Sequence, residues 1–161
     1  MAFVKYPQVN PGDEIVNHQP KVWEDFKAKP GEKALITMHT VPFEGSVGLI
    51  NMLTATRLVR KGYDFTLLLY GPGVLMAAET RGFPKVGDEG FAGNLSFNKQ
   101  LKVIMAEGGK VLACRFALSA LYGFHEAQLI PGVQVIHPLD VLDCIIDHQR
   151  HGALIISTWT V

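Results

Sequence analysis

Five short apolar runs, separated by segments with helical spacing, constrain the fold of this chain more than any other feature. Each run is apolar throughout rather than alternating, which is typical of strands buried on both faces of a parallel sheet. We expect strands at residues 34–40, 63–70, 110–113, 133–137 and 153–158. Because these runs alternate with helical segments, the sequence predicts an α/β fold, a three-layer α/β/α sandwich around a five-stranded parallel sheet.

The segments between the runs have recognisable helix ends. Ser46 is a good N-cap for a helix over 47–61, and Gly62 closes that helix. We expect further helices at residues 74–80, 95–107, 115–123 and 138–150. Right-handed crossovers make all five strands point the same way, so their carboxyl ends form one edge. Ligands of open α/β sheets bind at that edge, which here collects His39, Gly71, Cys114, His137 and Trp159.

Two segments fall outside this pattern. Residues 1–33 contain four prolines and are predicted to form an arm on the 34–161 domain, with one short helix at 20–29. Val22, Trp23 and Phe26 would share a face of that helix. We expect the chain's own domain, in preference to a neighbouring subunit, to cover them. Residues 81–94 have no regular pattern and predict either a lid or an oligomer contact.

Composition excludes several classes of function. The chain has 161 residues, is 48% hydrophobic and carries no formal net charge, with its lysines and arginines dispersed. It therefore lacks the basic stripe of a nucleic-acid-binding protein. No apolar run approaches a membrane span, and the first residues lack the core of a signal peptide, so we expect a cytoplasmic protein. The two cysteines, Cys114 and Cys144, are far apart and predict neither a disulfide scaffold nor a zinc ribbon.

Cys114 is the sharpest candidate for chemistry. It lies between the third predicted strand and the helix that follows. At a helix N-terminus, the helix dipole and the free backbone N–H groups stabilise the thiolate form of a cysteine. Arg115 would add to this effect if its side chain turned inward. The alternative is a small buried hydrophobe that fills space under the sheet edge. Both interpretations of Cys114 remain open at this stage.

Two histidines end other strands and are candidate ligands. His39 and His137 could each meet Cys114 as a base, an orienting group or a metal ligand, although capping is the commoner use of such a histidine. Glu44 follows the first strand and could add an acid or a fourth ligand, against the alternative of a solvated loop carboxylate. A shared metal site is therefore one hypothesis, and no cofactor is certain.

Backbone N–H groups offer a second kind of binding site. Ser46, at a helix start, and the turn through Gly71 and Gly73 could both present N–H groups to an anion. N-capping and turn geometry explain the same residues, and neither segment matches a P-loop or GxGxxG pattern. Cys144 flanks the apolar stripe of the last helix and is expected to be structural.

The segment VLACRFALSALYG resembles the strand–cysteine–helix region of the DsrE/DsrF/DsrH-like family of small α/β proteins, together with LITMHT, GPGV and LIPGVQVIHPLDVLD. The segment TVPFEGSVGLINMLTATRLVRKGYDFTLLLYGPGV is similar to a subgroup of nitrogen-starvation response proteins. The resemblance implies a DsrE-like domain from about residue 34 onward and a homo-oligomer, a trimer or hexamer. In sulfur-relay members, the cysteine matched by Cys114 carries a persulfide. The arm and the 81–94 insertion depart from that pattern.

Three functions follow as hypotheses. The first is an oligomeric protein of the nitrogen-starvation response that binds a small ligand or metal around His39, Cys114 and His137. The second is a sulfur-relay protein that uses Cys114 as persulfide carrier with a protein partner. The third is a structural subunit of a larger complex. A buried Cys114 sulfur would disfavour the second hypothesis most.

Overall fold

A five-stranded, fully parallel sheet forms the centre of the protein, with the strand order β6-β5-β2-β1-β7. The computed structural model describes residues 23–42, 47–80, 85–86, 91–92 and 95–159. The strands of the sheet are β1 (Lys33–His39), β2 (Asp64–Leu69), β5 (Lys110–Cys114), β6 (Gln134–Ile136) and β7 (Leu154–Trp159). The predicted α/β/α architecture and all five predicted strands are confirmed.

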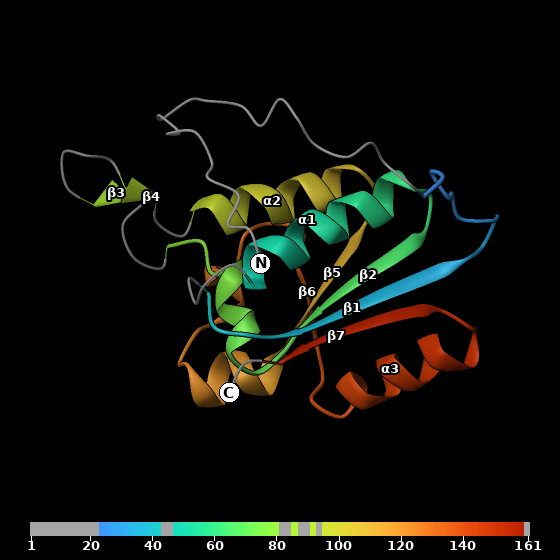
Figure 1. The fold of residues 1–161 in the computed structure, drawn as a ribbon. Helices are drawn as coiled ribbons and strands as arrows, with labels where there is room; N and C mark the ends of the chain where they lie inside the picture. Colours follow the sequence, from blue (N-terminus) through green and yellow to red (C-terminus); the bar gives the residue numbers. More distant parts are fainter. Residues whose placement is uncertain (1–22, 43–46, 81–84, 87–90, 93–94, 160–161) are drawn as a thin grey trace, which may run out of the picture.

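Helices cover both faces of this sheet. The helices are α1 (Val47–Arg60), α2 (Leu95–Ala106) and α3 (Asp140–Arg150). Figure 1 shows α1 and α2 side by side on one face and α3 on the other, next to β7. Inward side chains of the strands, such as Met38, Leu67 and Ala113, are fully buried in a core shared with α1 and α2.

Short helical turns follow two of the strands at their carboxyl ends. The 3₁₀ helix η1 (Gly71–Ala77) follows β2, three residues earlier than the helix expected at 74–80. After β5, residues 115–116 are α-helical and continue into the π-helix η2 (Ala117–Leu121). A third short turn, η3 (Glu126–Gln128), leads toward β6. η1 and η2 contact each other at the carboxyl edge of the sheet.

The helix predicted at 20–29 is wrong over its described part, residues 23–29, which contains no helix. The Ala28 N–H bonds the Lys61 carbonyl oxygen at 2.9 Å, and the Lys61 ammonium contacts the Asp25 carboxylate at 2.5 Å. The segment therefore bonds to the residue that follows α1 instead of forming its own helix. A helix of about ten residues, as predicted at 20–29, is too short to be stable alone. Trp23 and Phe26 are exposed, so the expected cover by the domain is also wrong for them.

The irregular stretch is described only in part. It contains β3 (Lys85–Val86) and β4 (Phe91–Ala92), which pair antiparallel as a separate two-stranded sheet. The expectation of a lid or an oligomer contact at 81–94 concerns mainly residues outside the described ranges, and it stays a prediction. Within the described ranges, no helix combines the length and apolar character required to cross a bilayer.

Candidate functional site

The strand order decides which of the predicted site residues meet. His39 ends β1, Cys114 ends β5, and His137 follows β6. β5 and β6 are neighbours, with Cys114 in register with Ile136, but β2 lies between β5 and β1. Because neighbouring strands are about 4.8 Å apart, the ends of β1 and β6 are separated by about 14 Å. The edge itself is confirmed, whereas the three residues do not converge.

A shared metal site is therefore wrong for the described residues. They contain no group of three or more His, Cys, Asp or Glu side chains that could hold a metal ion. His137 instead accepts a hydrogen bond at Nδ1 from the Leu139 N–H at 3.2 Å, ahead of α3. His137 therefore acts as a capping residue before α3, which was the alternative to a metal ligand or base at this position. Glu44 and Ser46 lie outside the described residues, so their predicted binding roles stay predictions.

Cys114 is packed rather than presented to solvent. Its side chain is 7% exposed and belongs to the main hydrophobic core. Arg115 turns outward, because its Nε donates to the Glu126 carboxylate at 2.6 Å and both side chains are half-exposed. The guanidinium that was expected to stabilise a thiolate is therefore paired elsewhere. The geometry supports the packing interpretation of Cys114.

Three rings meet at the carboxyl end of β1. The His39 and Trp159 rings are stacked, with centroids 4.6 Å apart and planes inclined by 27°. The Tyr70 ring contacts both edge-on, at 5.1 Å from His39 and 5.5 Å from Trp159. The register explains the cluster, because His39 is the partner of Trp159 and Tyr70 directly follows β2. Burial raises the pKa of Tyr70 and outweighs an opposing effect of Thr37.

Gly71 and Gly73 serve close packing at this edge. Gly71 has a φ of 51°, and a Cβ atom there would overlap the His39 imidazole at Nε2 and Cδ2. A Cβ atom at Gly73 would overlap the Met38 carbonyl oxygen. Only glycine therefore allows η1 to lie directly against the end of β1. The turn-geometry interpretation accounts for both glycines, and their predicted contact with an anion stays a prediction.

Two polar atoms next to the ring cluster have no hydrogen-bond partner within the described part of the chain. They are His39 Nδ1 and Thr40 Oγ1, and the Thr40 side chain is completely buried. Buried polar groups are almost always paired with protein, water or a ligand. The sequence analysis missed Thr40 and Tyr70 as site residues. The only signal available was their position at the ends of two neighbouring strands.

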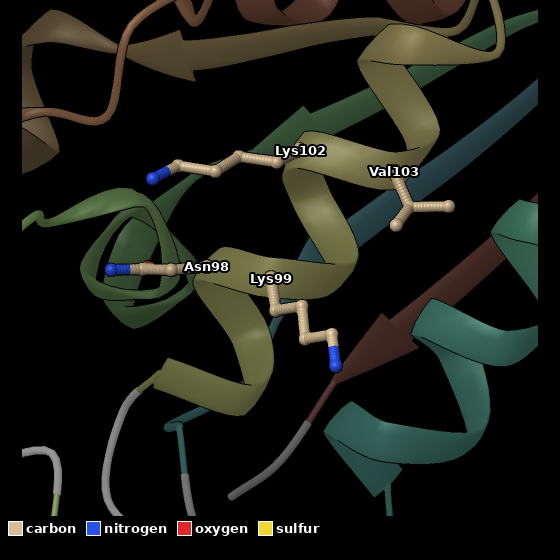
Figure 2. A pocket seen from close by; sticks show the side chains of 4 residues that line it. All are labelled: Asn98, Lys99, Lys102 and Val103. Atoms are coloured by element: carbon tan, nitrogen blue, oxygen red, sulfur yellow. The ribbon is translucent and has the colours of Figure 1, made fainter.

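A cavity of about 400 Å³ lies elsewhere, against α2. Figure 2 shows its lining residues Asn98, Lys99, Lys102 and Val103, with the two lysine side chains pointing to different sides. The Asn98 amide nitrogen donates to the Ala78 carbonyl oxygen at 3.0 Å, which ties α2 to the end of η1. Because the two ammonium groups diverge, the cavity does not present a convergent anion site.

Comparisons with known proteins identify the fold. The E. coli protein ychN has a TM-score of 0.61 and 18% sequence identity to this chain, over 79% of this chain and 99% of ychN. The fold is DsrE-like. MTH1491, a protein of unknown function from Methanobacterium thermoautotrophicum, has a TM-score of 0.58 and 16% identity, over 78% of this chain and 100% of its own. No family model and no curated protein sequence matches the chain.

Proposed function

We propose that this DsrE-like protein binds a small polar molecule at the carboxyl end of β1. The observation that carries the proposal is the pair of buried, unpartnered atoms within the described chain, His39 Nδ1 and Thr40 Oγ1. A molecule that supplies hydrogen bonds to both would remove a cost of about 1–3 kcal/mol for each orphaned group. The edge is also where open α/β sheets bind ligands.

Binding without catalysis fits the surroundings of this site better than a reaction does. The candidate nucleophile Cys114 ends a strand two positions away from β1, and its sulfur is in the core. The resemblance of residues 40–74 to nitrogen-starvation response proteins supports a regulatory role for ligand binding, as part of the response to nitrogen starvation. Homo-oligomerisation is part of the proposal, and it is supported by exposed leucines on two helices, Leu53 of α1 and Leu142 of α3.

Fluorescence titration tests the proposal directly. Trp23 and Trp159 are the two tryptophans, so a Trp23→Phe variant leaves Trp159, stacked on His39, as the reporter. The probes are a panel of free amino acids, 2-oxo acids and nucleoside monophosphates. We expect at least one probe to change the Trp159 emission saturably. His39→Ala should weaken that binding by about tenfold or more, through loss of one buried hydrogen bond.

His137→Ala is the matched control, because His137 is an exposed histidine at the same sheet edge, three strands from β1. It should leave the affinity unchanged. A panel without any saturable response, or equal affinity in the His39→Ala variant, would contradict the proposal.

Sulfur relay through Cys114 is the second candidate function. Its support is the position of Cys114, the last residue of β5, directly before a helical turn. Burial of the side chain and the outward ion pair of Arg115 oppose it. Cyanide-releasable sulfur on the wild-type protein after incubation with a persulfide donor, lost in Cys114→Ser, would establish this candidate in place of the first.

A further inference from the structure

A third buried polar atom near His39 lacks a hydrogen-bond partner among the described residues. It is Oγ1 of Thr37, a residue that is 1% exposed. Thr37 and His39 are two residues apart on β1, so their side chains lie on the same face of the sheet. Thr37 opposes the rise of the Tyr70 pKa, so the phenol is close by, but it does not bond Thr37 Oγ1. Thr37 Oγ1 and His39 Nδ1 therefore leave two hydrogen bonds unmade on one face.

The imidazole of His39 is closed on two sides. Gly71 packs against Nε2 and Cδ2 so closely that no Cβ atom would fit, and the Trp159 indole lies over the ring face. Nδ1 is the nitrogen left for a ligand, which reaches this buried atom only if a covering side chain moves. Tyr70 packs against the hydrophobic core, whereas Trp159 is 63% exposed. The indole is therefore the ring that moves with the smaller loss of buried surface.

The neighbours of these two atoms favour an uncharged ligand. The register places Ser157 and Leu68 beside Thr37, and Trp159 beside His39. None of these side chains carries a formal charge, so a carboxylate or phosphate bound here would be buried beside strand residues that supply no counter-ion. A ligand without a charge fits these surroundings at a lower cost of desolvation.

The indole over His39 indicates the shape of the ligand, because this position accepts a flat aromatic ring inclined by 27° to the imidazole. A threonine hydroxyl donates and accepts, and Nδ1 does either according to its tautomer. Nucleobases are flat and present donors beside acceptors on one edge. We infer, on the basis of the function proposed above, that the ligand is an uncharged nitrogen heterocycle of the nucleobase type. It replaces the Trp159 indole over His39 and bonds Thr37 Oγ1 in addition to His39 Nδ1.

Calorimetric titration of the full chain tests the class of ligand. The probes are adenosine, guanosine, cytidine and uridine with their free bases, and ribose phosphate and 2-oxoglutarate represent charged molecules without an aromatic ring. We expect at least one base or nucleoside to bind saturably and neither charged molecule to do so.

Thr37→Val tests the hydroxyl, because it replaces the oxygen by a methyl group of similar shape. It should weaken binding by about tenfold without lowering the melting temperature, since the hydroxyl has no partner among the described residues. A purely structural role would lower the melting temperature instead. Thr158→Val is the matched control and should leave the affinity unchanged. Thr158 is in register with Met38, so its side chain lies on the opposite face of the sheet from Thr37.

Trp159→Ala tests the displacement of the indole. Removal of a ring that competes with the ligand should raise the affinity by about threefold or more. Trp159→Phe keeps a flat ring over His39 and should stay close to the wild type. If Trp159→Ala fails to fold by circular dichroism, acrylamide quenching of Trp159 in the Trp23→Phe variant replaces it. Quenching should then increase when the ligand binds, because the indole moves into water.

The outcomes separate this inference from the proposed function. Binding of ribose phosphate or 2-oxoglutarate that requires His39, with no response to any base or nucleoside, would overturn the inference and leave the proposed function standing. No response to any probe would overturn both. Equal affinity in Thr37→Val would overturn the inference, as would weaker binding to Trp159→Ala or reduced quenching of Trp159, since the ligand would then stack on the indole instead of replacing it.

Discussion

The imidazole of His39 lies between two contacts, the indole of Trp159 stacked on its face and the α-carbon of Gly71 against its Nε2 edge. The first contact follows from the parallel register of β1 and β7. The second follows from the turn after β2, which approaches β1 so closely that no side chain fits between them. The position of the histidine is therefore fixed by three strands that lie side by side in the sheet.

Gly71→Ala should be strongly destabilising. The substitution places a Cβ atom onto the His39 ring and also forces alanine to a φ of 51°. Overpacking typically costs about 1–3 kcal/mol, and the positive φ adds about 1 kcal/mol. We expect the free energy of unfolding in urea to fall by about 2–4 kcal/mol. Gly123→Ala is the control, because Gly123 has a φ of 68° with open space around its Cα, and it should lose only about 1 kcal/mol. Equal losses would contradict the close packing at Gly71.

The two cysteines should both react slowly with iodoacetamide, for different reasons. Cys114 is almost fully buried, so its alkylation should require unfolding of the protein. Burial, with a smaller contribution from Asp147, raises the pKa of Cys144 above the ordinary thiol value of 9.0. The alkylation rate of Cys144 should therefore rise at a higher pH than that of a free thiol. The fold is favoured by the neutral thiol, so this contribution to stability is full at low pH and declines as the pH rises above that ordinary value.

Single-cysteine variants separate the two reactions. Asp147→Asn removes the negative charge beside Cys144 and should move its alkylation profile to lower pH. Alkylation of Cys114 in the native state at neutral pH would contradict its burial and would strengthen the sulfur-relay hypothesis.

His148 should be the residue that fixes α3 to the sheet. Its Nδ1–H donates to the Cys144 carbonyl oxygen at 2.8 Å, so its Nε2 is left to accept from the Thr66 hydroxyl at 3.2 Å. We expect His148→Ala to reduce the free energy of unfolding by about 2–4 kcal/mol, through a cavity and a lost buried hydrogen bond. His151→Ala, on the exposed end of the same helix, should cost less than about 0.5 kcal/mol. A similar loss in both variants would argue against this anchoring.

Local pattern was sufficient to predict the sheet but not the positions of most functional groups. The apolar runs place His39 and Trp159 at the same edge without knowledge of strand order. The separation of His39 from Cys114 depends on β2 lying between β1 and β5, which no local spacing encodes. The outward turn of Arg115 depends on Glu126, eleven residues later. Tertiary contacts decided these features, and they also decided against a helix at 23–29.

The segment before β1 should stay attached to α1 down to very low pH. A hydrogen bond from Lys61, followed by one from Lys27, lowers the pKa of Asp25 to about 2 from the ordinary value of 3.8. Because this pKa is depressed in the folded state, the pair is fully formed above pH 3.8 and is lost as the pH falls through about 2. A carbon-13 NMR titration of the Asp25 carboxyl group should give a midpoint near about 2.

Lysine substitutions identify which partner holds this segment. Lys61→Met keeps the aliphatic stem but removes the ammonium that makes the largest contribution, so the Asp25 midpoint should rise from about 2 toward 3.8. Hydrogen exchange of the Ala28 amide should also become faster. This amide bonds the Lys61 carbonyl oxygen, and loss of the ion pair with Asp25 leaves the segment held to residue 61 by fewer contacts. Lys27→Met should move the midpoint less and leave Ala28 protected, since Lys27 lies within the segment itself. A larger shift from Lys27→Met would mean that Asp25 is paired locally and that α1 does not hold the segment.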